Sequence, residues 1–277
     1  VNIDTQSPLI YDLKSNDSDN VSRSDAVLNF TVDIVDNNTA YVEFGNSTLF
    51  NMSLLSQSGA NSTWFSLKNL SELGCVNEDI CTIKAIAYDK ATNSNTTTYQ
   101  LTVDDTKPIV NLLSPVNNSN TSLNYVNITF NVTDNLDTIL ECDLYVNGNI
   151  NNTNNSVSEN TNTIISTTTL VNGTYTYYVE CEDSADNFNT SLAKQFTVDQ
   201  EKPSITITRP VVNEIVGRFI TITADVTDTY TNVEKVWYEI YNESNDVLLY
   251  NNILSNIGGD TYSDSSFNSS LYCPSSY

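Results

Sequence analysis

The chain has 277 residues and a net charge of −23, yet only 16% of its residues are charged, because Lys and Arg are scarce. Such an anionic surface repels phosphates and anionic lipid head groups, which argues against nucleic-acid and membrane-surface partners. The sequence contains no His, the commonest general base and the usual zinc ligand, and no Gly-rich phosphate loop, so we expect no enzyme.

Short runs of alternating apolar and polar residues recur along the chain between Asn, Gly and Asp clusters. No segment has a sustained apolar stripe at helical spacing, so the chain is predicted to be all-β. The runs form three successive repeats that begin at Pro8, Pro108 and Pro203. The first two intervals are each about a hundred residues long, which is typical of a β-sandwich.

Each repeat begins with a short strand after its proline and continues with a longer strand that ends in Asp, at Asp36, Asp134 or Asp228. A third strand follows, in which a large core residue is expected near Phe44 in the first repeat and near Trp237 in the third. The first two repeats then carry a penultimate strand and a last strand. The third repeat stops before its penultimate strand.

The five cysteines favour an oxidising compartment. Such a compartment would pair Cys75 with Cys81 and Cys142 with Cys181, although buried free thiols are an alternative for the second pair. The counterpart of Cys75 in the third repeat is Cys273, whose partner is expected beyond Tyr277.

N-glycosylation is the preferred explanation for about twenty N-x-S/T sequons, roughly twice the number expected from composition. Compositional drift is the alternative for any single site. Ten sequons are the predicted sites: Asn29, Asn51, Asn61, Asn69, Asn127, Asn131, Asn172, Asn189, Asn242 and Asn268. The Asn-rich stretch 147–163 is interpreted as a glycosylated or mobile loop.

The strand order, the V-D-x-x-K-P linkers and the D-x-A-x-N turns that begin at Asp89 and Asp183 resemble the immunoglobulin-like modules of archaeal and bacterial cell-surface proteins. This resemblance covers nearly the whole chain and implies S-layer proteins, adhesins, stalks or pilus-like threads. The predicted fold is three tandem immunoglobulin-like β-sandwiches at 8–105, 106–200 and 201–277, the third incomplete at its C-terminal end. Residues 1–7 are then the end of a preceding last strand, a linker or a donor strand that completes a neighbouring subunit.

A hard-cation site is predicted where the first linker meets the second repeat. The turns after the second strand and before the last strand lie at the N-terminal end of such a sandwich, so their carboxylates should face the linker. Carboxylate oxygens suit Ca²⁺, although Asp in tight turns often binds only its own backbone. The predicted ligands are Asp104, Asp105, Asp134, Asp137, Asp183 and Asp186. Similar groups are Asp4, Asp36 and Asp89, and Asp199, Glu201 and Asp228.

These features together predict an extracellular, cell-surface, glycosylated structural protein, part of an archaeal surface layer, stalk or filament. Its expected partners are other copies of itself, other surface-layer proteins and glycans, with donor-strand exchange between subunits as one mode of assembly. The alternative is an adhesin or binding ectodomain that recognises glycans or another cell. The sequence shows no membrane-spanning run.

Overall fold

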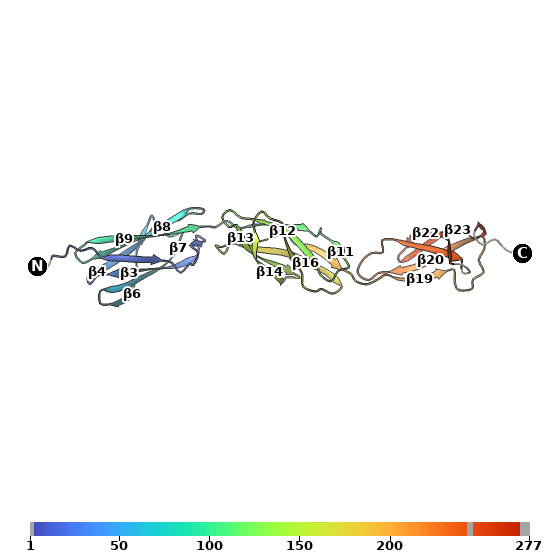
Figure 1. Ribbon diagram of the computed structural model, residues 1–277, viewed down its shortest axis with the longest axis horizontal. Helices are drawn as coiled ribbons and strands as arrows, with labels where there is room; N and C mark the ends of the chain where they lie inside the picture. The colour runs from blue at the N-terminus through green and yellow to red at the C-terminus, as the bar shows by residue number, and fades with distance from the viewer. Residues whose placement is uncertain (1–2, 243–245, 272–277) are drawn as a thin grey trace. The chain divides into compact units, whose positions relative to one another are not determined.

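The computed structural model describes residues 3–242 and 246–271, and Figure 1 shows strands joined by loops throughout. The regular elements in these ranges are strands, apart from one short 3₁₀ turn, Ser269–Leu271. The chain is therefore all-β, as its alternating sequence predicts. No helix among the described residues is long and apolar enough to cross a membrane. The partner predicted for Cys273 lies outside the described residues.

The first repeat folds into a two-sheet sandwich. In spatial order, its strands are β1 (Leu9–Lys14), β3 (Val27–Val35), β7 (Asn61–Asn69) and β6 (Ser53–Ser58) in one sheet, and β2 (Val21–Ser22), β9 (Ser94–Val103), β8 (Ile80–Asp89), β4 (Thr39–Gly45) and β5 (Leu49–Asn51) in the other. An immunoglobulin-like sandwich places strands A, B, E and D in one sheet and C, F and G in the other. The observed order matches this pattern, with β1 as strand A and β9 as strand G.

The core of this sandwich follows from alternation along its strands. On β3 every second side chain is buried, and Phe30, Val32 and Ile34 have 0% exposure. Phe30 packs against Phe44 of β4, with 5.4 Å between the ring centroids. Phe44 is thus the buried third-strand residue that the sequence predicts.

The second repeat has the same strand order, except that its first sheet has three strands and holds no counterpart of β6 among the described residues. Its strands are β10 (Ile109–Ser114), β12 (Asn127–Thr133) and β15 (Thr163–Ser166) in one sheet, and β11 (Ser119–Thr121), β18 (Lys194–Val198), β16 (Gly173–Glu182), β13 (Ile139–Val146) and β14 (Asn149–Ser158) in the other, with β17 (Phe188–Thr190) paired to β16. The described residues thus contain the immunoglobulin-like topology twice.

The prediction of a loop is wrong for part of the stretch 147–163. Residues Asn149–Ser158 form β14, which pairs antiparallel with β13. The turn between them is Asn147-Gly148, in which both residues have positive φ. An Asn-Gly turn of this kind closes a two-residue hairpin, and it imposes strand pairing on a sequence whose composition resembles a loop.

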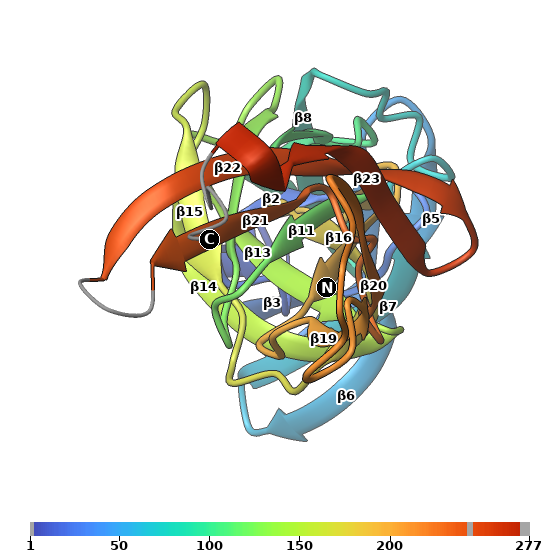
Figure 2. The same ribbon diagram turned by 90° about the vertical axis from the view of Figure 1, so that its right-hand side faces the viewer.

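The third repeat forms one continuous sheet. Its order is β19 (Ser204–Arg209), β20 (Phe219–Thr227), β23 (Thr261–Asn268), β22 (Val247–Gly258) and β21 (Val236–Asn242), and β22 and β23 lie side by side in Figure 2. Up to Leu271, the described part of this repeat holds no counterpart of β8 and β9. Ile205 is accordingly 58% exposed, whereas Ile10 and Val110, at the same distance from their prolines, are each 7% exposed.

The placement of Trp237 in the core is wrong. Trp237 is 58% exposed, and its neighbour Val236 is the buried residue, at 5%. Val236 lies eight residues after Asp228, the same spacing that separates Phe44 from Asp36. Because side chains alternate between the two faces of a strand, an error of one residue moves the side chain to the opposite face.

Both predicted disulfides are present. Cys142 of β13 bonds Cys181 of β16, two neighbouring strands of one sheet, with a Cα–Cα distance of 4.1 Å. Both sulfurs belong to side chains with 0% exposure. Cys75 bonds Cys81 at the start of β8.

By compactness, the chain divides into two units rather than three. The first contains the described residues of Val1–Ser114, Ile128–Ile165 and Tyr178–Ala193, and the second contains those of Pro115–Asn127, Ser166–Tyr177 and Lys194–Tyr277. These limits pass through β16 and differ from the module boundaries inferred from the repeats. The division at 105/106 and 200/201 therefore stays a prediction.

Candidate metal centre

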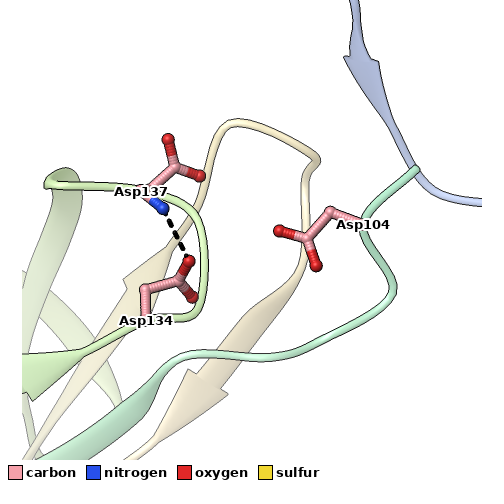
Figure 3. Close-up of side chains that lie close together, drawn as sticks. All are labelled: Asp104, Asp134 and Asp137. Carbon is pink, nitrogen blue, oxygen red and sulfur yellow. Dashed lines mark hydrogen bonds between the residues drawn. The ribbon is translucent and has the colours of Figure 1, made fainter. Parts of the chain in front are cut away.

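Three carboxylates meet where the first linker joins the second repeat, all within the first compact unit. Asp134 and Asp137 lie on the turn that follows β12, and Asp104 lies opposite them on the segment that follows β9 (Figure 3). Each residue offers one ligand oxygen, and these oxygens lie within 4.8 Å of one another.

The turn after β12 is shaped by Asp134 itself. Its Oδ1 accepts hydrogen bonds from the backbone N–H groups of Leu136 and Asp137, both at 2.9 Å. This bonding of Asp to its own following backbone is the usual reason that Asp occupies tight turns. It uses one carboxylate oxygen, and Oδ2 of Asp134 is buried without a hydrogen-bond partner among the described residues.

Asp104 is the most buried member of the group, with 0% exposure. Its backbone N–H donates to the carbonyl oxygen of Ser22, and its Oδ1 accepts from Thr106 N at 2.9 Å and from Asn135 Nδ2 at 3.2 Å. Its Oδ2 has no hydrogen-bond partner in the described ranges, although it is buried. In Figure 3 the Asp104 carboxylate points towards the turn that carries Asp134.

Asp137 is held by the turn that follows β16. Its Oδ2 accepts hydrogen bonds from the backbone N–H of Ser184 at 3.0 Å and from the Ser184 hydroxyl at 2.8 Å. No Lys or Arg of the described chain forms an ion pair with Asp104, Asp134 or Asp137. The negative charge of the group is therefore not neutralised by a basic side chain.

The arrangement fits a hard divalent cation. A buried carboxylate oxygen without a partner costs about 1–3 kcal/mol or more, and two members of this group, Asp104 and Asp134, each have one such oxygen among the described residues. Ca²⁺ takes oxygen ligands at about 2.3–2.6 Å, so two ligands of one ion lie up to about 5 Å apart. The separation of at most 4.8 Å between the Asp oxygens is within that range.

The other three predicted ligands lie outside this group. Both oxygens of Asp183 are already used, because Oδ1 accepts from the N–H groups of Ala185 and Asn187 and Oδ2 accepts from Asn187 Nδ2. Burial raises the pKa of Asp183, and the charge of Asp104 adds to that increase. Asp105 is exposed and accepts from Ser24 N at 2.8 Å, and Asp186 is an exposed residue with φ 62°.

The residue that fastens the linker is Asn187, whose role the sequence did not suggest. Its Nδ2 donates to the carbonyl oxygen of Asp104 at 3.0 Å, and the residue is 3% exposed. Asn189 continues the contact by donating to the carbonyl oxygen of Pro108 at 2.9 Å. The recurrence of Asn at the end of the D-x-A-x-N turn was the signal that could have identified it.

The first repeat contains the same fastening. Asn93 Nδ2 donates to the carbonyl oxygen of Asp4 at 3.2 Å, and Asn95 Nδ2 donates to that of Pro8 at 3.0 Å. We define three joints, each made of a segment that leads into a repeat and of one turn in that repeat. The first joint is Asp4–Pro8 with the turn after β3, the second is Asp104–Pro108 with the turn after β12, and the third is Asp199–Pro203 with the turn after β20. In the first two joints, an Asn pair binds the backbone that leads into the sandwich.

The remaining predicted acidic groups are arranged differently. In the third joint Thr231 donates its hydroxyl to Asp199 Oδ2 at 2.7 Å, and Glu201 accepts from Asn172 Nδ2 at 3.2 Å. In the first joint Asp4 accepts a hydrogen bond from Asn38 Nδ2 at 3.5 Å. Both carboxylate oxygens of Asp89 accept hydrogen bonds within its own turn, as those of Asp183 do.

The predicted sequons differ in the exposure of their Asn side chains. Asn51, Asn61 and Asn127 are exposed, and the other seven predicted sites are half-buried. Asn172 and Asn189 already donate their Nδ2 groups, to Glu201 and to Pro108. Attachment of a glycan at either of these two sites would replace one of the two protons of a nitrogen that already donates a hydrogen bond in the folded chain.

No family model and no curated protein matches the sequence. Among solved structures, a tetra-tandem repeat from the extending region of a large adhesion protein is 17% identical, covering 96% of this chain and 66% of that chain, with a TM-score of 0.33. Three N-terminal domains of the highly immunogenic outer capsid protein of bacteriophage RB49 are 14% identical, covering 92% and 86%, with a TM-score of 0.37. A marsupial T cell receptor is 11% identical, covering 85% and 84%, with a TM-score of 0.42.

Proposed function

We propose that the protein is an extracellular, glycosylated structural element, a string of immunoglobulin-like modules in an archaeal surface layer, stalk or filament, without catalytic activity. The observation that carries this proposal is the repeated fastening at Asp4–Pro8 and Asp104–Pro108. At both places, side chains of a sandwich bind the backbone of the segment that leads into it. Such bonds restrict rotation about the segment, as a spacer requires. The disulfides and the density of sequons support the extracellular location.

Calcium is proposed to complete the second joint. Asp104, Asp134 and Asp137 would hold the ion with one oxygen each, and backbone carbonyls or water would supply further ligands. The ion would offset two of the three negative charges of these carboxylates, which lack a basic partner. It would also connect the linker residue Asp104 with the turn after β12, which stiffens the joint.

The proposed partners are other copies of the chain, other surface-layer proteins and glycans. Donor-strand exchange is the proposed mode of assembly. It is supported by apolar residues that are exposed on the sheet of the third repeat, such as Ile205 and Ile207 of β19. The alternative is an adhesin. The stretch 147–163 was the candidate for an inserted binding loop in that alternative, but much of it is a strand paired with β13.

Calcium-dependent dimensions of the full chain test the structural role. We expect small-angle X-ray scattering to show a more extended, narrower distribution of dimensions in CaCl₂ than in EDTA, together with a higher melting temperature. Unchanged dimensions and an unchanged melting temperature would contradict the calcium-stiffened spacer. Ordered polymers in electron micrographs would support assembly, whereas binding to a glycan array by a chain that stays monomeric would favour the adhesin.

A further inference from the structure

The three joints share two aspartates but differ in a third residue. One aspartate lies on the segment that leads into the repeat, and the other directly follows β3, β12 or β20. The pairs are Asp4 with Asp36, Asp104 with Asp134, and Asp199 with Asp228. The residue three positions after the second aspartate is Thr39 in the first joint, Asp137 in the second and Thr231 in the third. This difference decides how the charge of each pair is balanced.

In the third joint, a hydroxyl balances the pair. The Thr231 hydroxyl lies 2.7 Å from Asp199 Oδ2 and 3.2 Å from Asp228 Oδ1, so it bridges the two carboxylates. The other Asp199 oxygen accepts from Glu201 N at 3.0 Å. Within the described ranges, neither Asp199 nor Asp228 retains a buried oxygen without a hydrogen-bond partner. Backbone N–H donation from Thr231 lowers the pKa of Asp228, so this carboxylate is stable in its charged form.

In the second joint, a carboxylate occupies the same position. A carboxylate cannot donate a hydrogen bond as the Thr hydroxyl does, and Asp137 accepts hydrogen bonds from Ser184 instead. The buried Oδ2 atoms of Asp104 and Asp134 are then left without donors among the described residues. A cation replaces the missing donor and offsets the third negative charge.

The first joint has less charge to balance. Asp4 and Asp36 are half-buried, whereas Asp104 has 0% exposure, and both Asp4 oxygens accept hydrogen bonds, from Gln6 N and Asn38 Nδ2. Its third position is the neutral Thr39. Asp36 Oδ2 and the Thr39 hydroxyl are buried without hydrogen-bond partners among the described residues. The first joint thus has one unpartnered carboxylate oxygen where the second has two, two carboxylates instead of three, and a hydroxyl at the third position that can donate a hydrogen bond.

We infer that this third position sets the cation requirement of each joint: Asp137 makes the second joint a calcium site, whereas Thr39 and Thr231 make the other two independent of calcium. The inference rests on the calcium role proposed above and narrows it to one of three related joints. The chain would then contain one joint whose stiffness follows the calcium concentration, next to joints with constant stiffness.

The test is titration of the full chain with CaCl₂ by isothermal calorimetry. The wild-type chain should bind one ion at the second joint. Asp137→Thr, which copies the residue of the third joint, should lose that binding and should raise the melting temperature in EDTA, since it removes repulsion. Thr231→Asp should raise the stoichiometry to two and lower the melting temperature in EDTA. Asp105→Asn is the matched control, because it removes one charge of the same linker and keeps an acceptor for Ser24.

Each outcome has a distinct meaning. Absence of calcium binding by the wild-type chain would overturn the proposed calcium role together with this inference. If the wild type and Asp137→Thr bind equally well, the calcium site survives and the inference fails. A Thr231→Asp chain that is folded in EDTA, by circular dichroism, and still binds a single ion would also overturn it. Loss of binding in the Asp105→Asn control would show that linker charge, and not the third position, sets the requirement.

Discussion

At the scale of single residues, amides and carboxyls have separate tasks in the second joint. Asn187 binds the backbone of Asp104 and the carboxylate of Asp183 at the same time, with bonds of 3.0 and 2.9 Å. Asp104, Asp134 and Asp137 each use one oxygen for hydrogen bonds within their own or a neighbouring turn, and each offers one oxygen to the group. The amide therefore positions the linker, and the carboxylates create the demand for a cation.

Replacing Asn187 by Ala should destabilise the chain by about 1–3 kcal/mol, because the change leaves buried acceptors of Asp104 and Asp183 without a donor. Thermal and chemical unfolding of the full chain measure this loss. The control is Asn149→Ala, since Asn149 is exposed and its Nδ2 donates to the carbonyl oxygen of Asn147 in its own turn. Equal stability of the two variants would contradict the positioning role of Asn187.

Asp17 gives a pH-dependent prediction. Burial and the neighbouring Asp19 raise the pKa of Asp17 to about 6, the charge of Asp186 adds to the increase, and its Oδ2 lacks a hydrogen-bond partner within the described ranges. The folded state therefore favours the protonated carboxyl more than the unfolded state does. Its stabilising contribution is complete below the ordinary pKa of 3.8 and is lost as the pH rises through about 6.

Asp17→Asn should therefore be more stable than the wild type at pH 7, by no more than about 1 kcal/mol because water screens the partly exposed carboxyl. The advantage should shrink as the pH falls from about 6 to 4. Unfolding of both chains across this pH range gives the difference directly. Asp79→Asn is the control, because it removes the same charge from an exposed position. A pH-independent difference would show that the Asp17 charge is not responsible.

At the scale of elements, the two disulfides constrain different lengths of chain. Cys142 and Cys181 join neighbouring strands across a sequence separation of 39, whereas Cys75 and Cys81 are separated by 6. In the chain-entropy model, a cross-link that closes a longer loop removes more freedom from the unfolded chain. The bond between β13 and β16 should therefore stabilise the fold more than the bond at the start of β8.

Chains lacking one pair test this difference. Cys142→Ala/Cys181→Ala should lose about 4 kcal/mol and Cys75→Ala/Cys81→Ala about 2 kcal/mol, according to the loop lengths. Differential scanning calorimetry of the two variants and the wild type provides the comparison. Alanine at position 181 is compatible with the fold, because Ala87 of β8 is the counterpart of Cys181 in the first repeat and is fully buried. A larger loss in the 75/81 variant would contradict the entropic account.

At the scale of the whole molecule, the net charge of −23 acts on every repeat. Acidic side chains far outnumber basic ones, so repulsion between them opposes the compact state. Most of these charges are exposed, and salt screens exposed charges over a distance that falls from about 30 Å at 0.01 M to about 8 Å at 0.15 M. Stability should therefore depend on ionic strength as well as on calcium.

Raising KCl from 10 to 150 mM in the presence of EDTA should increase the melting temperature of the wild-type chain, because screening weakens the repulsion. CaCl₂ at the same ionic strength should increase it further in the wild type and not in Asp137→Thr. Differential scanning fluorimetry at matched ionic strengths separates the two effects. Identical melting temperatures of the wild-type chain in KCl and in CaCl₂ would show that calcium acts only by screening charges, as any salt does.

The sequence by itself determined the all-β class, the repeat length, the cysteine pairing and the Asp positions in the turns. These features depend on alternation over a few residues and on spacing along the chain, both of which are local. The tertiary structure decided that Val236 and not Trp237 is buried, that Asn149–Ser158 pairs with β13, and that Asp104 meets Asp134 and Asp137 while Asp105 and Asp186 stay outside. These outcomes depend on strand register and on contacts between distant segments, where a shift of one residue reverses the direction of a side chain.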